Sequence, residues 1–150
     1  MIKRTHLAIG LSLGLYFLPL VTHKIFFIPI ILIASVLPDI DSMSSNIGRW
    51  KILRPIQVFF EHRGPLHSYT AAVLFSIILT FFIPSFSLPF FLGYSFHLFA
   101  DSFTVRGIRP FWPFKFHTEG SIRSGKLIDK VVFYTFVIID VFLLVLMFIK

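Results

Sequence analysis

The sequence predicts an all-α fold, a polytopic membrane helical bundle of about five membrane segments with a cytoplasmic N-terminus. Its 150 residues are 56% hydrophobic and 14% charged, with 21 Phe, and the mean hydropathy is +0.86. A soluble domain would carry roughly 25% charged residues. The apolar residues also form long blocks instead of alternating with polar residues. We therefore expect residues 1–150 to form one integral membrane domain.

Five apolar blocks define the expected helices, although several reach the roughly 20 residues of a full span only with their polar ends. In chain order they are Leu7–Val21, Ile25–Leu37, Leu66–Ile83, Phe86–Ala100 and Val131–Ile149. Basic residues precede the first block, as in a signal peptide, but no small-residue cleavage motif follows, so we expect a retained helix. Short connections at residues 22–24 and 84–85 predict two antiparallel hairpins.

The distribution of Lys and Arg predicts the orientation of the helices. With a cytoplasmic N-terminus, the N-terminal tail and the loops 39–65 and 101–130 hold every Lys and Arg except Lys24 and Lys150. This asymmetry follows the positive-inside rule. The net charge of +7 is thereby explained by topology. We expect no nucleic-acid partner, because a nucleic-acid-binding protein would carry a basic face on a soluble fold.

Histidines and aspartates cluster where the apolar blocks end. After His6 come LPDID, HRGPLHS and HLFAD, and the predicted topology places all of them at the cytoplasmic boundary. The chain has no cysteine, which leaves His, Asp and Glu as possible metal ligands. The pattern favours a metal site, although polar residues also lie at helix ends for purely structural reasons. The candidate ligands are His6, Asp39, Asp41, His62, His67, His97 and Asp101.

Local spacing supports two pairs of these residues. His97 and Asp101 are four apart, so on a helix they would share one face. His97 also lies within an apolar block, where an ionisable group is costly and usually functional. Asp39 and Asp41 are two apart and follow Pro38, where an extended backbone would point both carboxylates the same way.

The motif HRGPLHS predicts a helix start. Pro65 suits the first helical position, which places His67 in the first turn. Free backbone N–H groups at that start would favour a phosphate, and Arg63 would clamp it. The expected catalytic residues are Asp39, His67 and Arg63.

The ordered motifs resemble the YdjM-like family of inner-membrane metal-dependent hydrolases. The resemblance covers roughly residues 5–115 and rests on the early His, LPDID, HRGPLHS, GYSFHLFAD followed by Ser-Phe-Thr, and Gly107 before Pro110. That family is in turn distantly similar to zinc-dependent phospholipase C and S1/P1 nuclease, helical enzymes that cleave phosphate esters with His/Asp metal clusters. The resemblance implies a metal-dependent hydrolase in the bacterial inner membrane, with the seven candidate ligands holding its metal.

Seven candidates exceed the three or four protein ligands that one catalytic zinc takes. We expect one or two divalent ions, Zn2+ or alternatively Mn2+ or Fe2+, and two ions would suit phosphate-ester hydrolysis. The expected partners are membrane lipids, and the expected substrate is an anionic or phosphate-containing lipid or lipid-linked molecule. The segment RPFWPFKF (109–116) alternates basic and aromatic residues. It forms either an interfacial aromatic belt or the border of a mouth for an anionic headgroup.

Two other classes of protein fit the same residues. One is a non-catalytic metal-binding membrane protein, a sensor or a transporter, although a transporter would hold its ligands nearer the bilayer midplane. The other is a structural membrane protein whose polar clusters only cap helices. Asp140 lies too deep in the last block to join the cluster. We expect it to bond to a hydroxyl such as that of Ser76 or Thr80.

Overall fold

The computed structural model describes residues 1–41 and 64–149, and the regular structure of this part is helical. Isolated β-bridges pair Thr104 with Ile122 and Ile108 with Thr118. The described helices confirm the all-α prediction. They are α1 (Lys3–Phe17), α2 (Lys24–Ala34), α4 (Tyr69–Phe82), α5 (Pro84–Ser102) and α6 (Leu127–Ile149), with the 3-10 turns η1 (Leu18–Leu20), η2 (Leu37–Asp41) and η4 (Pro65–His67).

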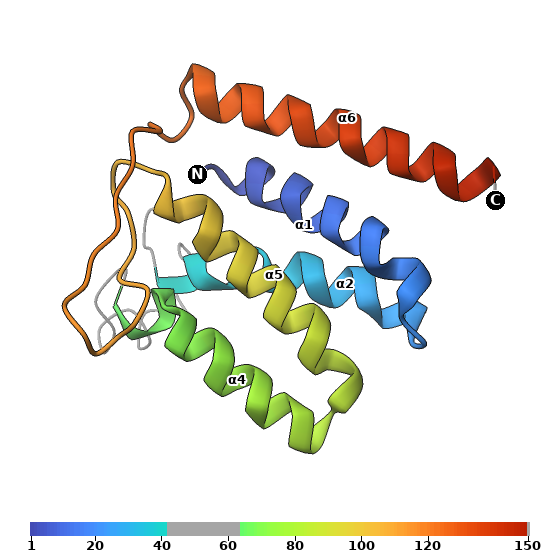
Figure 1. Cartoon of the computed structure of the whole chain (residues 1–150), viewed down its shortest axis with the longest axis horizontal. Coiled ribbons are helices and arrows are strands. Elements are labelled where there is room, and N and C mark those ends of the chain that lie inside the picture. The colour runs from blue at the N-terminus through green and yellow to red at the C-terminus, as the bar shows by residue number, and fades with distance from the viewer. Residues whose placement is uncertain (42–63, 150) are drawn as a thin grey trace.

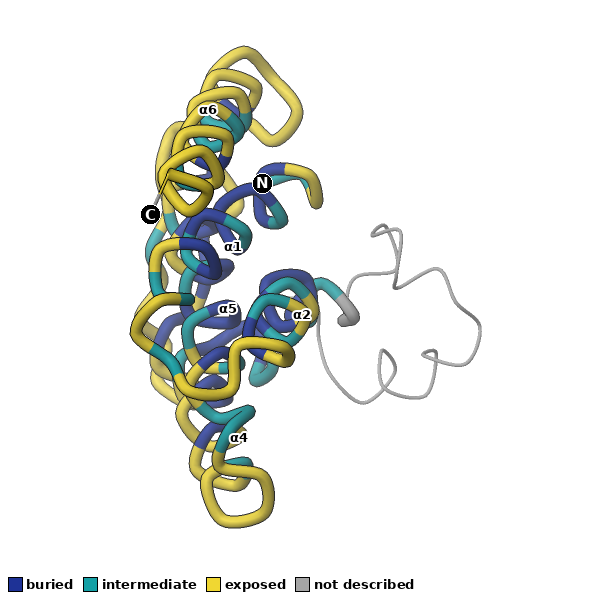
Figure 2. Tube along the Cα trace, turned by 90° about the vertical axis from the view of Figure 1, so that its right-hand side faces the viewer, coloured by how far each residue is buried: buried dark blue, intermediate teal, exposed yellow. Residues whose placement is uncertain are grey.

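The α-helices form a flattened layer (Figure 1). Helices α4, α5, α1 and α6 lie side by side in that order, and α2 packs against α1 and α5. Viewed from its edge, the layer is thin and α2 is displaced to one side of it (Figure 2). The connections between α1 and α2 and between α4 and α5 are short, as predicted, so each pair is an antiparallel hairpin.

Two glycines allow α2 to approach its neighbours closely. A Cβ atom on Gly93 of α5 would lie 2.3 Å from the carbonyl oxygen of Ile31, and one on Gly10 of α1 would lie 2.9 Å from the Cβ of Ser35. Both distances are too short for any real side chain. The start of α1 and the ends of α2 and α5 therefore lie close together. The predicted His and Asp ligands lie at or just beyond these positions.

One described helix, α6, is long and apolar enough to cross a membrane, and α4 is a shorter apolar helix. Helix α1 has 15 residues and α2 has 11, which at the helical rise give about 22 and 17 Å. The hydrocarbon core is about 30 Å thick. Helix α5 has 19 residues but carries both His97 and Asp101. The lengths of the described helices therefore do not confirm the predicted five membrane spans.

Helix α6 lies on the outside of the layer and packs against α1. Its only buried residues are Asp129 and Asp140. Beyond Lys130 the remaining surface is mostly apolar and exposed, including Val141, Phe142 and Leu146. An exposed apolar surface of this extent suits contact with lipid.

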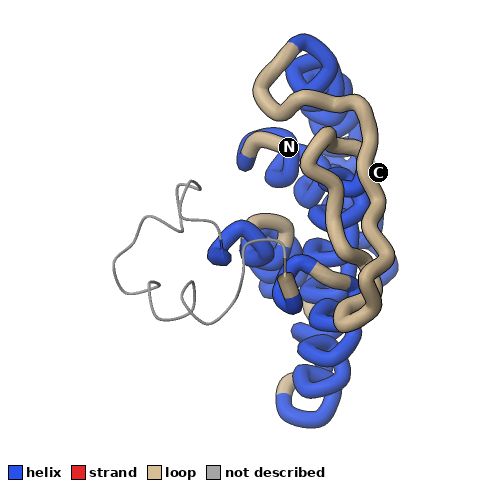
Figure 3. The backbone as a smooth tube through the Cα atoms, turned by 90° about the vertical axis from the view of Figure 1, so that its left-hand side faces the viewer, coloured by secondary structure: helices blue, strands red, loops and turns tan. Residues whose placement is uncertain are grey.

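The segment between α5 and α6 runs across one end of the helices (Figure 3). Its backbone is held by pairs such as Ile108 N–H to Thr118 O at 2.8 Å and Val105 N–H to Ile122 O at 3.0 Å. Gly107 has a φ of 57°, and a Cβ there would lie 1.8 Å from the Thr118 carbonyl oxygen. Only glycine fits this turn, which gives a physical reason for Gly107 in the motif.

Candidate metal centre

Four elements deliver His and Asp side chains to one end of the layer. His6 lies early in α1, Asp39 in η2, His67 at the end of η4, and His97 and Asp101 near the end of α5. The structure thus brings together five of the seven predicted ligands. Relative exposures are 1% for His6, 0% for His67, 1% for His97 and 2% for Asp101. The Asp39 side chain is 20% exposed.

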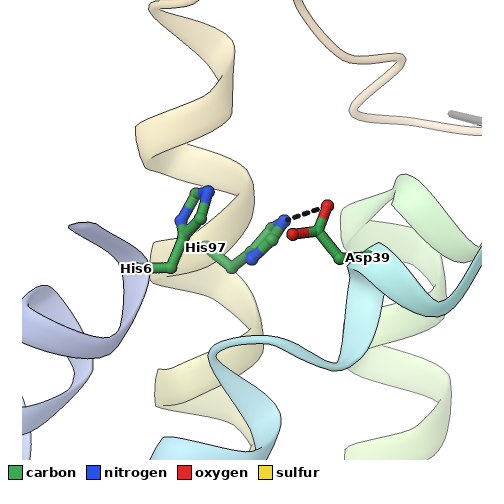
Figure 4. Close-up of side chains that lie close together, drawn as sticks. All are labelled: His6, Asp39 and His97. Carbon is green, nitrogen blue, oxygen red and sulfur yellow. Dashed lines mark ion pairs between the residues drawn. The ribbon is translucent and has the colours of Figure 1, made fainter. Parts of the chain in front are cut away.

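His97 lies at the centre of the group. Its ring stacks on that of His6, with centroids 3.9 Å apart and planes 17° apart. On its other side, Nε2 of His97 lies 4.0 Å from Oδ1 of Asp39 (Figure 4). One ligand atom from each of these three residues lies within 4.8 Å of the others. That spacing is close enough for a single cation to contact all three.

Asp101 organises a second, overlapping group. Its Oδ1 lies 3.3 Å from Nε2 of His6, and its Oδ2 lies 3.4 Å from Nε2 of His67. Oδ2 is also 4.0 Å from Nε2 of His97, on the same face of α5 as the spacing of four predicts. The amino group of Met1 contacts Oδ1 of the same carboxylate. Ligand atoms of His67, His97 and Asp101 again lie within 4.8 Å of one another.

A backbone contact fixes the tautomer of His97. Its Nδ1 lies 2.7 Å from the carbonyl oxygen of Ser35, at the end of α2. A carbonyl only accepts, so Nδ1 carries the proton and Nε2 presents its lone pair to the carboxylates. This arrangement is usual for a metal-binding histidine. Nε2 of His97 and Nδ1 of His6 have no hydrogen-bond partner among the described residues.

The donor set fits a divalent transition metal. Imidazole nitrogens and carboxylate oxygens suit Zn2+, and Mn2+ or Fe2+ also accept mixed N/O ligands. Buried polar atoms without partners are costly, and a cation would satisfy those of His6 and His97. His97 belongs to both groups, and because its Nδ1 is engaged by the Ser35 carbonyl, it has a single lone pair, on Nε2, for one cation. The two groups therefore fit either one ion that is shared between them, or two ions of which only one is bound by His97.

Asp39 sits at the open edge of the cluster. Burial raises the pKa of its carboxyl group, and the nearby His6 and His67 act in the opposite direction. A divalent cation beside Asp39 would strongly favour its ionised form. Asp39 is thus a partly exposed carboxylate whose ionised form a bound cation would favour.

The local structure differs from the expectation at two motifs. LPDID forms the 3-10 turn η2 instead of extended backbone, so the argument that residues two apart point the same way does not apply. In HRGPLHS, Pro65 begins the 3-10 turn η4 and not α4. Helix α4 starts at Tyr69, because Ser68 accepts a hydrogen bond from the Ala71 N–H at 3.2 Å and caps it.

Some predicted site residues lie outside the described part of the chain. These are His62, Arg63 and the side chain of Asp41, although the backbone of Asp41 ends η2. The anion clamp assigned to Arg63 and the full set of seven ligands therefore stay predictions.

Sequence reasoning missed the residues that position the ligands. The Tyr94 hydroxyl donates to the carbonyl oxygen of Leu66, next to His67. The Ser35 carbonyl orients His97, and no sequence pattern identifies a backbone acceptor. Tyr94 and Gly93 lie within GYSFHLFAD, so the motif itself could have pointed to them.

The expected partner of Asp140 is wrong. Its carboxylate accepts a hydrogen bond from Ser12 of α1. The hydroxyls of Ser76 and Thr80 instead donate within α4, to the carbonyl oxygens of Ala72 and Ser76. The physical reason is that α6 packs on α1, on the opposite side of the layer from α4.

The fold and the site define an all-helical protein with a buried His/Asp centre that could hold a divalent metal. Comparison with known families gives the identity more closely: residues 1–149 match the YdjM inner membrane protein family. The chain belongs to this family, which confirms the resemblance to YdjM-like inner membrane proteins and supports inner-membrane localisation. No curated protein and no solved structure matches the chain.

Proposed function

We propose that this protein is a membrane-embedded, metal-dependent hydrolase that cleaves phosphate esters of a lipid or lipid-linked substrate at the cytoplasmic face. The observation that carries the proposal is the convergence of three buried histidines and two aspartates from four elements. Three buried imidazoles around Asp101 are expensive to assemble for packing alone. A bound cation would compensate the cost of burying these groups together.

The described residues have distinct roles in this proposal. His6, His67, His97 and Asp101 hold the cation, which when bound would supply Lewis-acid activation of water and of the phosphoryl oxygens. Asp39 is the most exposed carboxylate of the group and accepts the proton of the attacking water. The water oxygen bonds to phosphorus as the ester P–O bond breaks, and the leaving alkoxide takes up that proton from Asp39 and departs as the alcohol.

The proposal also places all five described α-helices in the membrane. The metal site would then lie at one face of the bilayer. The hairpin tips support this multi-pass arrangement. Phe81 and Phe82 at the tip of the α4–α5 pair are 81% and 80% exposed, and Leu20 and Ile25 at the tip of the α1–α2 pair are 75% and 78% exposed. These apolar side chains, at the end away from the polar cluster, suit insertion into hydrocarbon, and His23 and Lys24 between Leu20 and Ile25 suit the far membrane interface.

A lipid substrate is favoured by the segment between α5 and α6. It is attached to the start of α4, where the Tyr69 N–H donates to Pro110 O at 2.8 Å and the Thr70 hydroxyl to Trp112 O at 2.8 Å. This places it beside η4 and His67. Between residues 106 and 116 its exposed side chains are basic and aromatic apart from Pro113, namely Arg106, Arg109, Phe111, Trp112, Phe114, Lys115 and Phe116. Such a surface suits anionic headgroups at the interface.

The experiment is hydrolysis by purified protein reconstituted with Zn2+, Mn2+ or Fe2+. Substrates are phospholipid vesicles, a lipid pyrophosphate and a generic phosphodiester. We expect metal-dependent cleavage that His97→Ala abolishes and His23→Ala retains, because His23 is exposed at the distant start of α2. Cleavage of none of the three substrates, together with unchanged metal content in His97→Ala, would overturn the proposal.

Burial of the site favours one alternative, a non-catalytic metal-binding protein. His6, His67, His97 and Asp101 are almost fully enclosed, and a sensor fills every coordination position with protein groups. Such a protein would bind metal tightly and lose it in His97→Ala, yet hydrolyse nothing. The same reconstitution experiment therefore separates the two functions.

A further inference from the structure

Helix α6 contributes a fully buried carboxylate outside the ligand group. Asp129, in the first turn of α6, has 0% exposure. It accepts three hydrogen bonds, from the Ile2 N–H at 3.1 Å, the Thr5 hydroxyl at 2.7 Å and the Gly125 N–H at 2.6 Å. A buried carboxylate is tolerated only when it is this well hydrogen-bonded.

These bonds join the beginnings of two helices. Ile2 is the N-cap residue of α1 and offers no side-chain cap. Gly125 precedes α6 and has a φ of 77°. Asp129 therefore joins the N-cap of α1 to the turn that leads into α6, and its negative charge is favourable beside the N–H groups at a helix start.

The start of α1 is also the part of the chain that enters the metal centre. Thr5 immediately precedes His6, whose ring stacks on His97. The amino group of Met1, on the other side of Ile2, contacts Asp101. A shift of this first turn would move His6 relative to both His97 and Asp101.

We propose that Asp129 is a positioning residue of the metal centre: by bonding Ile2 and Thr5 it fixes the first turn of α1 and thereby sets His6 among the ligands. This inference rests on the proposed metal-dependent function. Residues that orient metal ligands from outside typically change metal affinity by about 10- to 100-fold when they are mutated.

The chain provides a matched control on the same pair of helices. Asp140 is the other buried residue of α6, and it also accepts a hydrogen bond from a hydroxyl of α1, that of Ser12. Ser12 lies nearly two turns beyond His6. Asp140→Asn therefore perturbs the packing of α6 on α1 without touching the first turn.

The test is a chelator-competition titration of Zn2+ on the full-length, detergent-purified protein. Asp129→Asn and Asp140→Asn are compared, each in the wild-type and the His6→Ala background. Asn keeps the size of Asp but replaces an accepting oxygen with an NH2 donor. We expect Asp129→Asn to weaken Zn2+ binding by about 10- to 100-fold and Asp140→Asn to leave it nearly unchanged. In His6→Ala protein, Asp129→Asn should add little, because coupled residues are not additive.

Thr5→Val is a second variant, which tests the same positioning role if Asp129→Asn does not fold. It removes one of the three hydrogen bonds and should weaken Zn2+ binding less, again only when His6 is present. Unchanged affinity in both variants, an equal loss in His6→Ala protein, or an equal loss in Asp140→Asn would overturn the positioning role. Wild-type protein that binds no Zn2+ would overturn the proposed function and this inference with it. Wild-type protein that binds Zn2+, with unchanged affinity in both Asp129→Asn and Thr5→Val, would overturn the inference alone.

Discussion

At the scale of single residues, His97 decides what the site can do. Its Nδ1 is engaged by the Ser35 carbonyl, so its Nε2 is left to face Asp39 and Asp101, each at 4.0 Å. A histidine held in this way loses little conformational freedom when it binds a cation. The same residue is the one that sequence reasoning favours most, because an ionisable group inside an apolar block demands an explanation.

Tyr94 gives a test at this scale. Tyr94→Phe removes the hydroxyl that donates to the Leu66 carbonyl and frees the turn that carries His67. We expect the free energy of unfolding to fall by about 0.5–1.5 kcal/mol and Zn2+ affinity to fall several-fold, measured by chemical denaturation and chelator competition. Tyr16→Phe is the control, because Tyr16 is exposed and should change neither quantity. Equal Zn2+ affinity in Tyr94→Phe and wild type would show that His67 does not depend on this bond.

At the scale of elements, the contact between α2 and α5 holds η2 beside His97. Gly93→Ala would place a Cβ 2.3 Å from the Ile31 carbonyl oxygen, which belongs to rigid helix backbone. We expect a loss of stability of about 1–3 kcal/mol, and weaker Zn2+ binding because the Ser35 carbonyl that orients His97 moves with α2. Thermal unfolding and Zn2+ titration measure the two effects.

Gly14→Ala is the matched control for Gly93. Its Cβ would meet side-chain atoms of Ile31 and Ile28 at 3.2 and 3.3 Å, which can yield. We expect a smaller loss of stability and normal Zn2+ binding. A Gly93→Ala protein that keeps wild-type stability would contradict the close α2–α5 packing.

The elements also show where prediction from sequence succeeds and where it stops. Apolar blocks with polar ends predict helices and the gathering of His6, His97 and Asp101 at one end of them. They do not predict that LPDID would form a 3-10 turn, since its backbone follows from packing after Pro38. They also miss Ser12 as the partner of Asp140, because neighbouring helices in space depend on contacts between distant parts of the chain.

At the scale of the whole molecule, the distribution of basic residues predicts that the metal centre faces the cytoplasm. The absence of cysteine allows clean labelling of single introduced thiols. Ser121→Cys lies in the segment between α5 and α6, and Ser85→Cys lies at the α4–α5 tip. With an impermeant thiol reagent, we expect Ser121→Cys to react only in inside-out vesicles and Ser85→Cys to be protected from that side. Labelling of both from one side would contradict a transmembrane α4–α5 hairpin.

Elemental analysis of the detergent-purified protein tests the metal centre most directly, with wild type measured beside His97→Ala/Asp101→Ala and His23→Ala. We expect about one or two transition-metal ions per chain in the wild type and in His23→Ala, and none in the double variant. Wild-type protein that holds no metal after anaerobic purification and reconstitution would contradict the metal centre. Equal metal in wild type and the double variant would contradict it as well.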